Sequence, residues 1–191
     1  MIQCQNLSKA DLKRIGAWLA EAFQAEPGYS SGLPQKDAET LFTLLAETFY
    51  RKGHLYTTGE EQEGFCAYWT KSDRLSKWDW IRLGMKMAVY LSPKAGKIMQ
   101  DSQSDWMLTE KRYADQDYVE VFLVAIRREY QGQGLFRQIM AEPFTVAKKR
   151  GCCCVLDSDS EAKVAKYNHV GMRTVASQIQ RSGITMYALE I

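Results

Sequence analysis

The hydrophobic positions in residues 1–70 follow first a helical and then a strand period. Residues 1–4 predict a short strand, and Ser8 then begins a helix as its N-cap. Proline and glycine interrupt the chain before Asp37, where a second helix begins. The apolar stripes of these two helices are Leu12, Ile15, Leu19 and Phe23, and Leu41, Leu44, Leu45 and Phe49. Residues 54–58 and 64–70 then predict a hairpin.

The part of the chain after residue 113 alternates strands and helices. The predicted elements are a mostly apolar strand 118–126, a helix 135–149, a strand 152–157, a helix 161–169 and strands 173–181 and 184–190. A strand-helix-strand unit with an apolar strand at each end predicts a parallel pair joined by a right-handed crossover. The chain is therefore predicted to be one α/β domain with a mixed sheet.

Residues 71–113 are the least regular part and predict a helical insert. One helix carries Trp78, Trp80, Ile81, Leu83, Met87, Tyr90 and Leu91, and Pro93 begins another. Residues 71–112 hold nine Lys or Arg against five Asp or Glu, whereas residues 1–63 hold six against nine. An apolar stripe at helical spacing usually packs into a core. Large apolar side chains also line ligand cavities, and Trp78, Trp80 and Tyr90 are then candidates for an acceptor pocket.

A glycine turn follows the strand 118–126, in the sequence Gln131-Gly132-Gln133-Gly134-Leu135-Phe136-Arg137, and leads directly into a helix. Free backbone N–H groups and the positive end of a helix dipole meet at such a turn, which is how proteins hold phosphates. A dinucleotide fingerprint needs glycine at Arg137, and a nucleotide-triphosphate loop needs Gly-Lys-Ser/Thr, so both common nucleotide motifs are absent. A turn without any ligand is the alternative interpretation.

Composition and charge exclude several classes of protein. A chain of 191 residues that is 46% hydrophobic and 25% charged suits a single domain over residues 1–191. A net charge of +2 is too small to indicate a nucleic-acid partner. We expect no membrane partner and a cytoplasmic location, because the sequence has neither an uncharged apolar span of membrane length nor the apolar core of a signal peptide.

The five cysteines do not form a disulfide framework or a metal-binding pattern. Cys152, Cys153 and Cys154 are adjacent on a predicted strand, so they point alternately to opposite faces. They cannot easily converge on one tetrahedral metal ion. We therefore expect reduced, structural cysteines and no metal site.

Two spaced motifs resemble the GNAT superfamily of N-acetyltransferases. Gln131-x-x-Gly134 is similar to the Gln/Arg-x-x-Gly-x-Gly/Ala loop that holds the pyrophosphate of coenzyme A, although Phe136 occupies the last motif position. Tyr167-x-x-x-Gly171-Met172 is similar to the second signature, Tyr-x-x-x-Gly-Phe. The resemblance implies a mixed, mostly antiparallel sheet of six to seven strands with a splayed central parallel pair, helices on both faces and a helical insert at about residues 71–113, between the third and fourth strands.

The resemblance also implies acetyl-CoA as cofactor, and particular contacts to it. Backbone groups of Gln131, Gly132, Gln133, Gly134, Leu135, Phe136 and Arg137 would surround the pyrophosphate. The backbone of Val124, Ala125 and Ile126 would face the pantetheine arm, and Asn168 is a further candidate contact.

Catalytic roles follow from the chemistry of acetyl transfer, which needs a base for the amine and a proton for the departing thiolate. Tyr167 matches the family's tyrosine and is the candidate acid. Glu120 is the candidate base, acting through water, because its side chain is expected to share an apolar face with Phe122, Val124 and Ile126. His169 lies about 200° around the helix from Tyr167 and is expected on the surface.

The predicted reaction is transfer of an acetyl group to a primary amine of a small molecule or peptide. A homodimer is compatible with this interpretation. The alternative is a catalytically silent GNAT-fold module that binds acyl-CoA or a protein partner through the aromatic insert.

Overall fold

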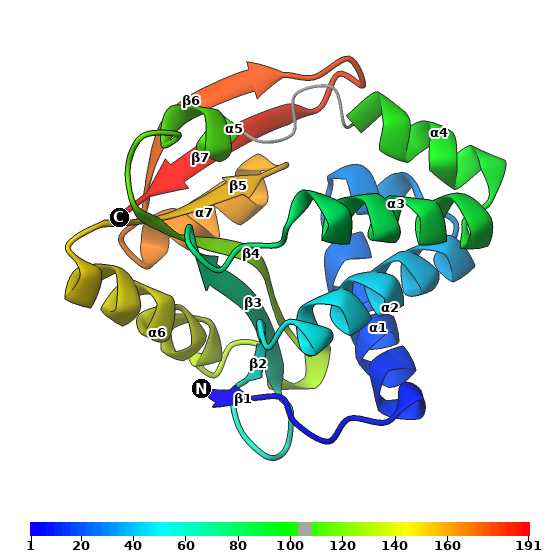
Figure 1. Ribbon diagram of the computed structural model, residues 1–191, viewed down its shortest axis with the longest axis horizontal. Coiled ribbons are helices and arrows are strands. Elements are labelled where there is room, and N and C mark those ends of the chain that lie inside the picture. The colour runs from blue at the N-terminus through cyan, green and yellow to red at the C-terminus, as the bar shows by residue number, and fades with distance from the viewer. Residues whose placement is uncertain (103–107) are drawn as a thin grey trace.

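The computed structural model describes residues 1–102 and 108–191, so residues 103–107 of the predicted insert lie outside the described part. Across the described residues, seven strands form one sheet in the order β1-β2-β3-β4-β5-β7-β6 (Figure 1). The strands are β1 (Ile2–Gln3), β2 (Leu55–Thr57), β3 (Gly64–Thr70), β4 (Tyr118–Ile126), β5 (Cys153–Ser158), β6 (Arg173–Ile179) and β7 (Thr185–Glu190). Only β4 and β5 are parallel neighbours among them. The predicted mixed, mostly antiparallel sheet is confirmed.

Helices cover both faces of this sheet, as predicted (Figure 1). They are α1 (Lys9–Gln24), α2 (Gln35–Arg51), α3 (Lys77–Tyr90), α4 (Pro93–Ser102), α5 (Leu108–Arg112), α6 (Leu135–Arg150) and α7 (Glu161–His169), with short 3-10 helices η1 (Tyr29–Gly32) and η3 (Arg128–Tyr130). Helices α1, α2 and α3 pack on one face, and α6 and α7 pack on the other. Helices α3, α4 and α5 form the insert between β3 and β4.

The starts of the key helices follow from their sequence. The Ser8 side chain accepts from the Asp11 N–H while Asp11 accepts from the Ser8 N–H, which is a capping box. Ser76 and Asp79 form the same arrangement at the start of α3. The predicted apolar stripes of α1 and α2 are buried against Phe65 and other side chains of one sheet face. Leu83 of α3 joins the same buried cluster and so places the insert over that face.

The central parallel pair is splayed. β4 and β5 pair at Tyr118 with Cys153, Val119 with Cys154 and Glu120 with Val155. Beyond Glu120, the remaining residues of β4 pair only with β3, and the remaining residues of β5 pair only with β7. A gap therefore opens between the two strands immediately after Glu120, as the resemblance implied.

A β-bulge in β4 corrects one prediction about side-chain directions. The pairing with β3 passes from Val121 to Leu123, so Phe122 is an extra residue in β4. Phe122 and Leu123 consequently both pack toward α1 and α2, and Val124 and Ile126 pack toward α6. The prediction that Glu120 shares a face with Phe122, Val124 and Ile126 is wrong beyond Phe122, because a bulge reverses the alternation.

None of the described helices is both long enough and apolar enough to cross a bilayer.

Candidate active site

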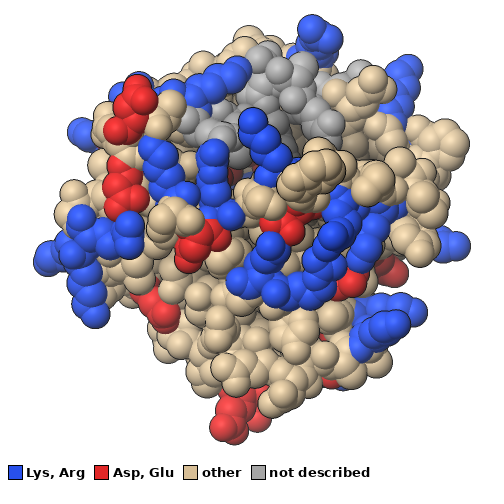
Figure 2. All heavy atoms as spheres, viewed as in Figure 1, with Lys and Arg blue, Asp and Glu red and all other residues tan. Residues whose placement is uncertain are grey.

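A cavity of about 800 Å³ begins at the gap between β4 and β5 and extends beneath the insert. Its floor includes Trp69 and Phe122 from the sheet, and Phe42 of α2 and Met87 of α3 contribute to its walls. This volume is in the range of small-molecule sites. Lys and Arg side chains gather over α3 and α5 on the face that carries the insert (Figure 2).

The three aromatic residues predicted for an acceptor pocket lie in different places. Trp80 lines the cavity, with its ring 5.6 Å from that of Phe122. Trp78 and Tyr90 are 76% and 64% exposed, and neither lines the cavity. Only Trp80 is therefore kept in the proposed acceptor site.

Glu120 lies at the point where β4 and β5 separate, in the last residue pair of the parallel ladder. Glu120 lines the cavity, and the residue as a whole is 8% exposed. The indole Nε1 of Trp69 donates a hydrogen bond of 2.9 Å to Glu120 Oε2. The side chain is thus held in a fixed position at the inner end of the cavity.

Asp157 is a second carboxylate of the cavity, and it was not among the residues predicted from the sequence. It lies two residues beyond Val155 on β5, so it points to the same face as Val155. The Thr109 hydroxyl donates to Asp157 Oδ1 at 2.6 Å, and the Thr109 N–H donates to the same atom at 3.2 Å. Burial raises the pKa of Asp157 to about 6, although the bonds from Thr109 oppose the shift. The sequence signal that could have identified Asp157 is the strand alternation, which places it on the same face of β5 as Val155.

Replacing Asp157 by asparagine should remove part of the pH dependence of folding. Because the pKa of Asp157 rises from 3.8 to about 6 on folding, the folded protein binds this proton more tightly than the unfolded chain. Its contribution to stability is present below pH 4 and is lost as the pH rises toward 6, by at most about 3 kcal/mol. Urea unfolding between pH 4 and 7 should show this fall in the wild type and a smaller one in Asp157→Asn. The exposed Asp115→Asn is the control, and identical slopes in all three proteins would contradict the expectation.

Asp159 is the third carboxylate of the cavity. Lys163 Nζ donates to its Oδ1 at 2.6 Å, and the Tyr29 N–H donates to its Oδ2 at 3.0 Å. Gly28 has φ +153°, and a Cβ there would lie 2.4 Å from Asp159 Oδ2. Glycine at this position therefore allows the start of η1 to approach the end of β5.

Tyr167 lies on the other face of the sheet, on α7, and packs against the first turn of α6. Its ring is 5.4 Å from that of Phe136. Burial, with smaller effects from acidic groups that include Asp159 and Glu26, raises the pKa of Tyr167 well above its usual value. One oxygen of Glu26 is paired with Lys166, and the other is buried without a hydrogen-bond partner among the described residues. The Tyr167 hydroxyl is therefore protonated at neutral pH.

The glycine turn leaves backbone groups available for an anion. Gly132 and Gly134 have φ +77° and +79°, and no atom lies within 4 Å of a Cβ built at either position. Within the described structure, the N–H groups from Gly132 to Phe136 make no backbone hydrogen bond. Gln131 Nε2 donates to the Ile126 carbonyl at 3.1 Å and ties the turn to β4. That carbonyl is therefore already occupied.

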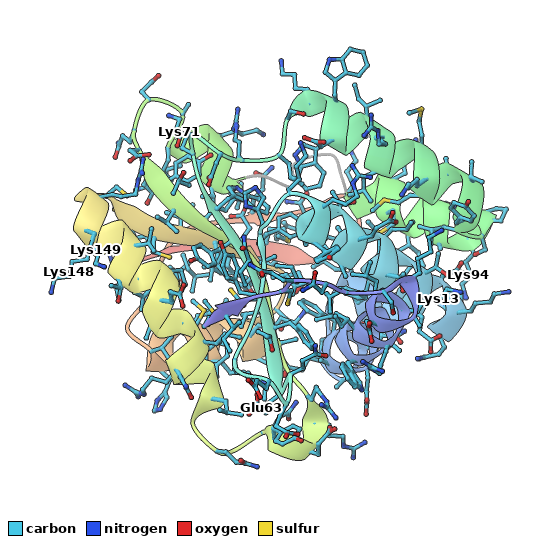
Figure 3. All side chains as sticks on the ribbon, turned by 60° about the horizontal axis from the view of Figure 1, so that its bottom comes forward. Lys13, Glu63, Lys71, Lys94, Lys148 and Lys149 are labelled. Carbon is cyan, nitrogen blue, oxygen red and sulfur yellow. The ribbon has the colours of Figure 1, made fainter. Side chains whose placement is uncertain are left out.

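The dipole of α6 favours an anion at the same turn. The first turn of α6 has no acidic residue, and Gly134 provides no side-chain cap. Its last turn carries Lys148, Lys149 and Arg150, the first two of which are labelled at the far end of the helix in Figure 3. The negative end of the dipole is thus compensated and the positive end is free.

The remaining predicted cofactor contacts lie around this turn. Gln133, Arg137 and Asn168 are exposed, and Leu135 is half-buried. Val124, Ala125 and Ile126 follow the splay point on β4. His169 is exposed, as expected.

The cysteines are placed as the strand alternation predicts. Cys154 packs toward α6, whereas Cys153 packs against Tyr113 and Tyr118. Burial raises the pKa of Cys4 to about 12 and that of Cys66 well above its usual value, so these thiols are unreactive at neutral pH. Among the described residues, no three His, Cys, Asp or Glu side chains are grouped to hold a metal ion.

A splayed parallel pair in a mostly antiparallel sheet, a glycine turn at a helix N-terminus and helices on both faces are the features of the fold that the sequence resemblance implied. Several solved N-acetyltransferases share this fold with the chain. No protein-family model matches the chain, and no curated protein matches it.

Three of these structures match over nearly their whole length. A polyamine N-acetyltransferase of Drosophila melanogaster, which forms N-acetylagmatine, has a TM-score of 0.62 at 11% identity, covering 98% of this chain and 97% of that one. An N-acetyltransferase from Staphylococcus aureus has a TM-score of 0.60 at 14% identity, covering 98% of both chains. Arylalkylamine N-acetyltransferase 2 from Aedes aegypti has a TM-score of 0.61 at 10% identity, covering 98% of this chain and 96% of that one. Identities this low show the fold alone.

Proposed function

We propose that this protein is an N-acetyltransferase that moves an acetyl group from acetyl-CoA to a primary amine. The observation that carries the proposal is the gap that opens after Glu120, with an 800 Å³ cavity on one face and the glycine turn and Tyr167 on the other. A donor bound along one face can meet an acceptor in the cavity only through such a gap.

Acetyl-CoA fits the residues around the turn. The free N–H groups from Gly132 to Phe136, at the positive end of α6, suit its pyrophosphate. Backbone groups of β4 beyond Glu120 have no partner on the β5 side and suit the amides of the pantetheine arm. Phe136 departs from the family pattern through its side chain, which packs on Tyr167 and leaves its own N–H free.

The proposed roles of the residues follow from their positions. Acetyl-CoA supplies a thioester whose carbonyl carbon an amine can attack. Glu120, held by Trp69, accepts the proton of the amine through a water molecule. Tyr167, which packs on the first turn of α6 beside the glycine turn, donates its phenolic proton toward the departing sulfur.

The proposed acceptor is a small-molecule or peptide amine with an apolar body. Aromatic and aliphatic side chains such as Trp80 and Met87 make up most of the cavity wall. The charged residues of the lining are the acidic Glu120, Asp157 and Asp159 and the basic Lys71, Arg74, Lys77 and Lys111. The apolar wall buries an apolar substituent, and the aromatic rings together with Glu120 suit the amine end of such a molecule. The matched enzymes that form N-acetylagmatine or act on arylalkylamines are consistent with an amine acceptor.

Titration calorimetry with acetyl-CoA, followed by a thiol-release assay over a panel of amines, tests the proposal. We expect binding and the release of coenzyme A with at least one amine. Binding without turnover on any amine would favour the silent acyl-CoA-binding module, and no binding at millimolar cofactor would overturn both interpretations.

Gly134→Ala should weaken acetyl-CoA binding by about tenfold, because a side chain at positive φ strains the turn that presents the N–H groups. Gly151→Ala is the matched control. Gly151 has φ +67°, has no atom within 4 Å of a built Cβ and lies at the other end of the same helix. Calorimetry should show weaker binding only for Gly134→Ala, and equal losses in the two variants would contradict a cofactor role for the turn.

A further inference from the structure

Helix α3 has two apolar faces, and only one of them is buried. Its inner face contributes Trp80, Leu83 and Met87 to the wall of the cavity. A surface helix normally carries polar residues on the opposite side. In α3 that side instead carries a row of exposed apolar residues, the outer stripe, which consists of Trp78, Ile81, Met85 and Val89.

The outer stripe is continuous along the helix. At about 100° per residue, its four side chains fall within an arc of about 80° and extend over about 16 Å. Their exposed fractions are 76% for Trp78, 49% for Ile81, 60% for Met85 and 76% for Val89. Single exposed apolar residues are common, but a row of this kind marks an interaction site.

The charge around the outer stripe is positive. Arg82 lies along one edge of the stripe and Lys77 lies along the other, by the same helical geometry. Lys86 lies beyond Arg82 and is paired with Glu47 at 2.9 Å. Residues 71–97 contain seven Lys or Arg and two Asp or Glu, and one of these acids, Asp79, is buried against Lys52. The Lys and Arg side chains over this helix are visible in Figure 2. The partner of the stripe must therefore be anionic as well as apolar.

We propose that the outer stripe of α3 binds peripherally to an anionic lipid bilayer. Exposed Trp, Ile, Met and Val between flanking Lys and Arg are the features of a helix that lies in the interfacial plane of a membrane. A second copy of this chain would bring the same positive edges together, which disfavours self-association through this face. The expectation of no membrane partner rested on the absence of a spanning segment, and interfacial binding needs none.

The proposal also connects the membrane to the cavity. Gly84 lines the cavity and is itself exposed, and no atom lies within 4 Å of a Cβ built there. The cavity thus reaches the surface beside Met85 of the outer stripe. An apolar amine dissolved in the lipid could enter the cavity at this edge. The bilayer contact itself does not depend on the proposed acetyl transfer.

Vesicle co-sedimentation of the full chain tests the contact. We expect binding to vesicles of phosphatidylcholine with 30% phosphatidylserine and little binding to phosphatidylcholine alone. Met85→Glu/Val89→Glu should lower the binding constant by at least about tenfold, since two apolar side chains are lost and two repelled charges are gained. The matched control is Ile2→Glu/Ile179→Glu. Ile2 on β1 and Ile179 on β6 are 51% and 73% exposed. This control variant should retain more of the wild-type vesicle binding than Met85→Glu/Val89→Glu does.

The charges give a second, independent measurement. Arg82→Glu should weaken binding to anionic vesicles more than Arg181→Glu, an exposed site at the β6–β7 turn. The proposal is overturned if the wild type does not bind anionic vesicles, or if each control variant loses as much binding as its partner. It is also overturned if light scattering shows a dimer that Met85→Glu/Val89→Glu dissociates, because the stripe would then bind a second copy.

Discussion

Tyr167→Phe is expected to lower the turnover number by about 10² or more and to leave the affinity for acetyl-CoA nearly unchanged. The substitution removes only the phenolic oxygen, so the ring contact with Phe136 is kept. Loss of the proton donor should appear in kcat, because that donor acts on the departing sulfur. Steady-state kinetics and calorimetry measure the two quantities separately.

Tyr187→Phe is the matched control for this experiment. The Tyr187 hydroxyl donates to Glu161 Oε1 at 3.1 Å, on the same helix that carries Tyr167. The control therefore removes a tyrosine hydroxyl near that helix but outside the proposed site. We expect its turnover to match that of the wild type. If Tyr167→Phe also kept full turnover, Tyr167 would not be the acid.

Glu120→Gln is expected to lower kcat/KM by about 10² or more at neutral pH, because glutamine cannot accept the proton of the amine. The amide oxygen can still accept from Trp69 Nε1, so the geometry of the floor is preserved.

Asp157 is the competing candidate for the base, and Asp157→Asn tests it. Asp157 lines the same cavity, and its pKa of about 6 is close to the ideal for a base. Two results together would assign the role of base to Asp157 instead. The pH-rate profile of the wild type would show an acidic limb with a midpoint near 6 that disappears in Asp157→Asn, and Glu120→Gln would remain active.

Most of the fold could be predicted because local patterns and the tertiary structure agree. The apolar run of β4 and the amphipathic pattern of α7 gave their boundaries directly. The splay of β4 and β5 was inferred from resemblance, since no local pattern in either strand shows where a ladder ends. The structure places that end at Glu120 and Val155.

The site was less accessible to prediction, for two physical reasons. The bulge at Phe122 depends on how β4 aligns with β3, which is a pairing between distant segments. In α3, two apolar faces obscure which side is buried, so Trp78 and Trp80 could not be distinguished by periodicity. Asp157 was missed because its partner Thr109 comes from the insert, 48 residues away in sequence.

The bulge at Phe122 also makes the number of residues in β4 as important as their identity. Before it, Glu120 points into the acceptor cavity, and after it Val124 and Ile126 point toward α6. Loss of a single residue from this strand would exchange the faces of every side chain on one side of the deletion. Insertions and deletions here should therefore be far more damaging than substitutions, so natural or engineered variants of this protein should preserve the length of β4 even where its residues change.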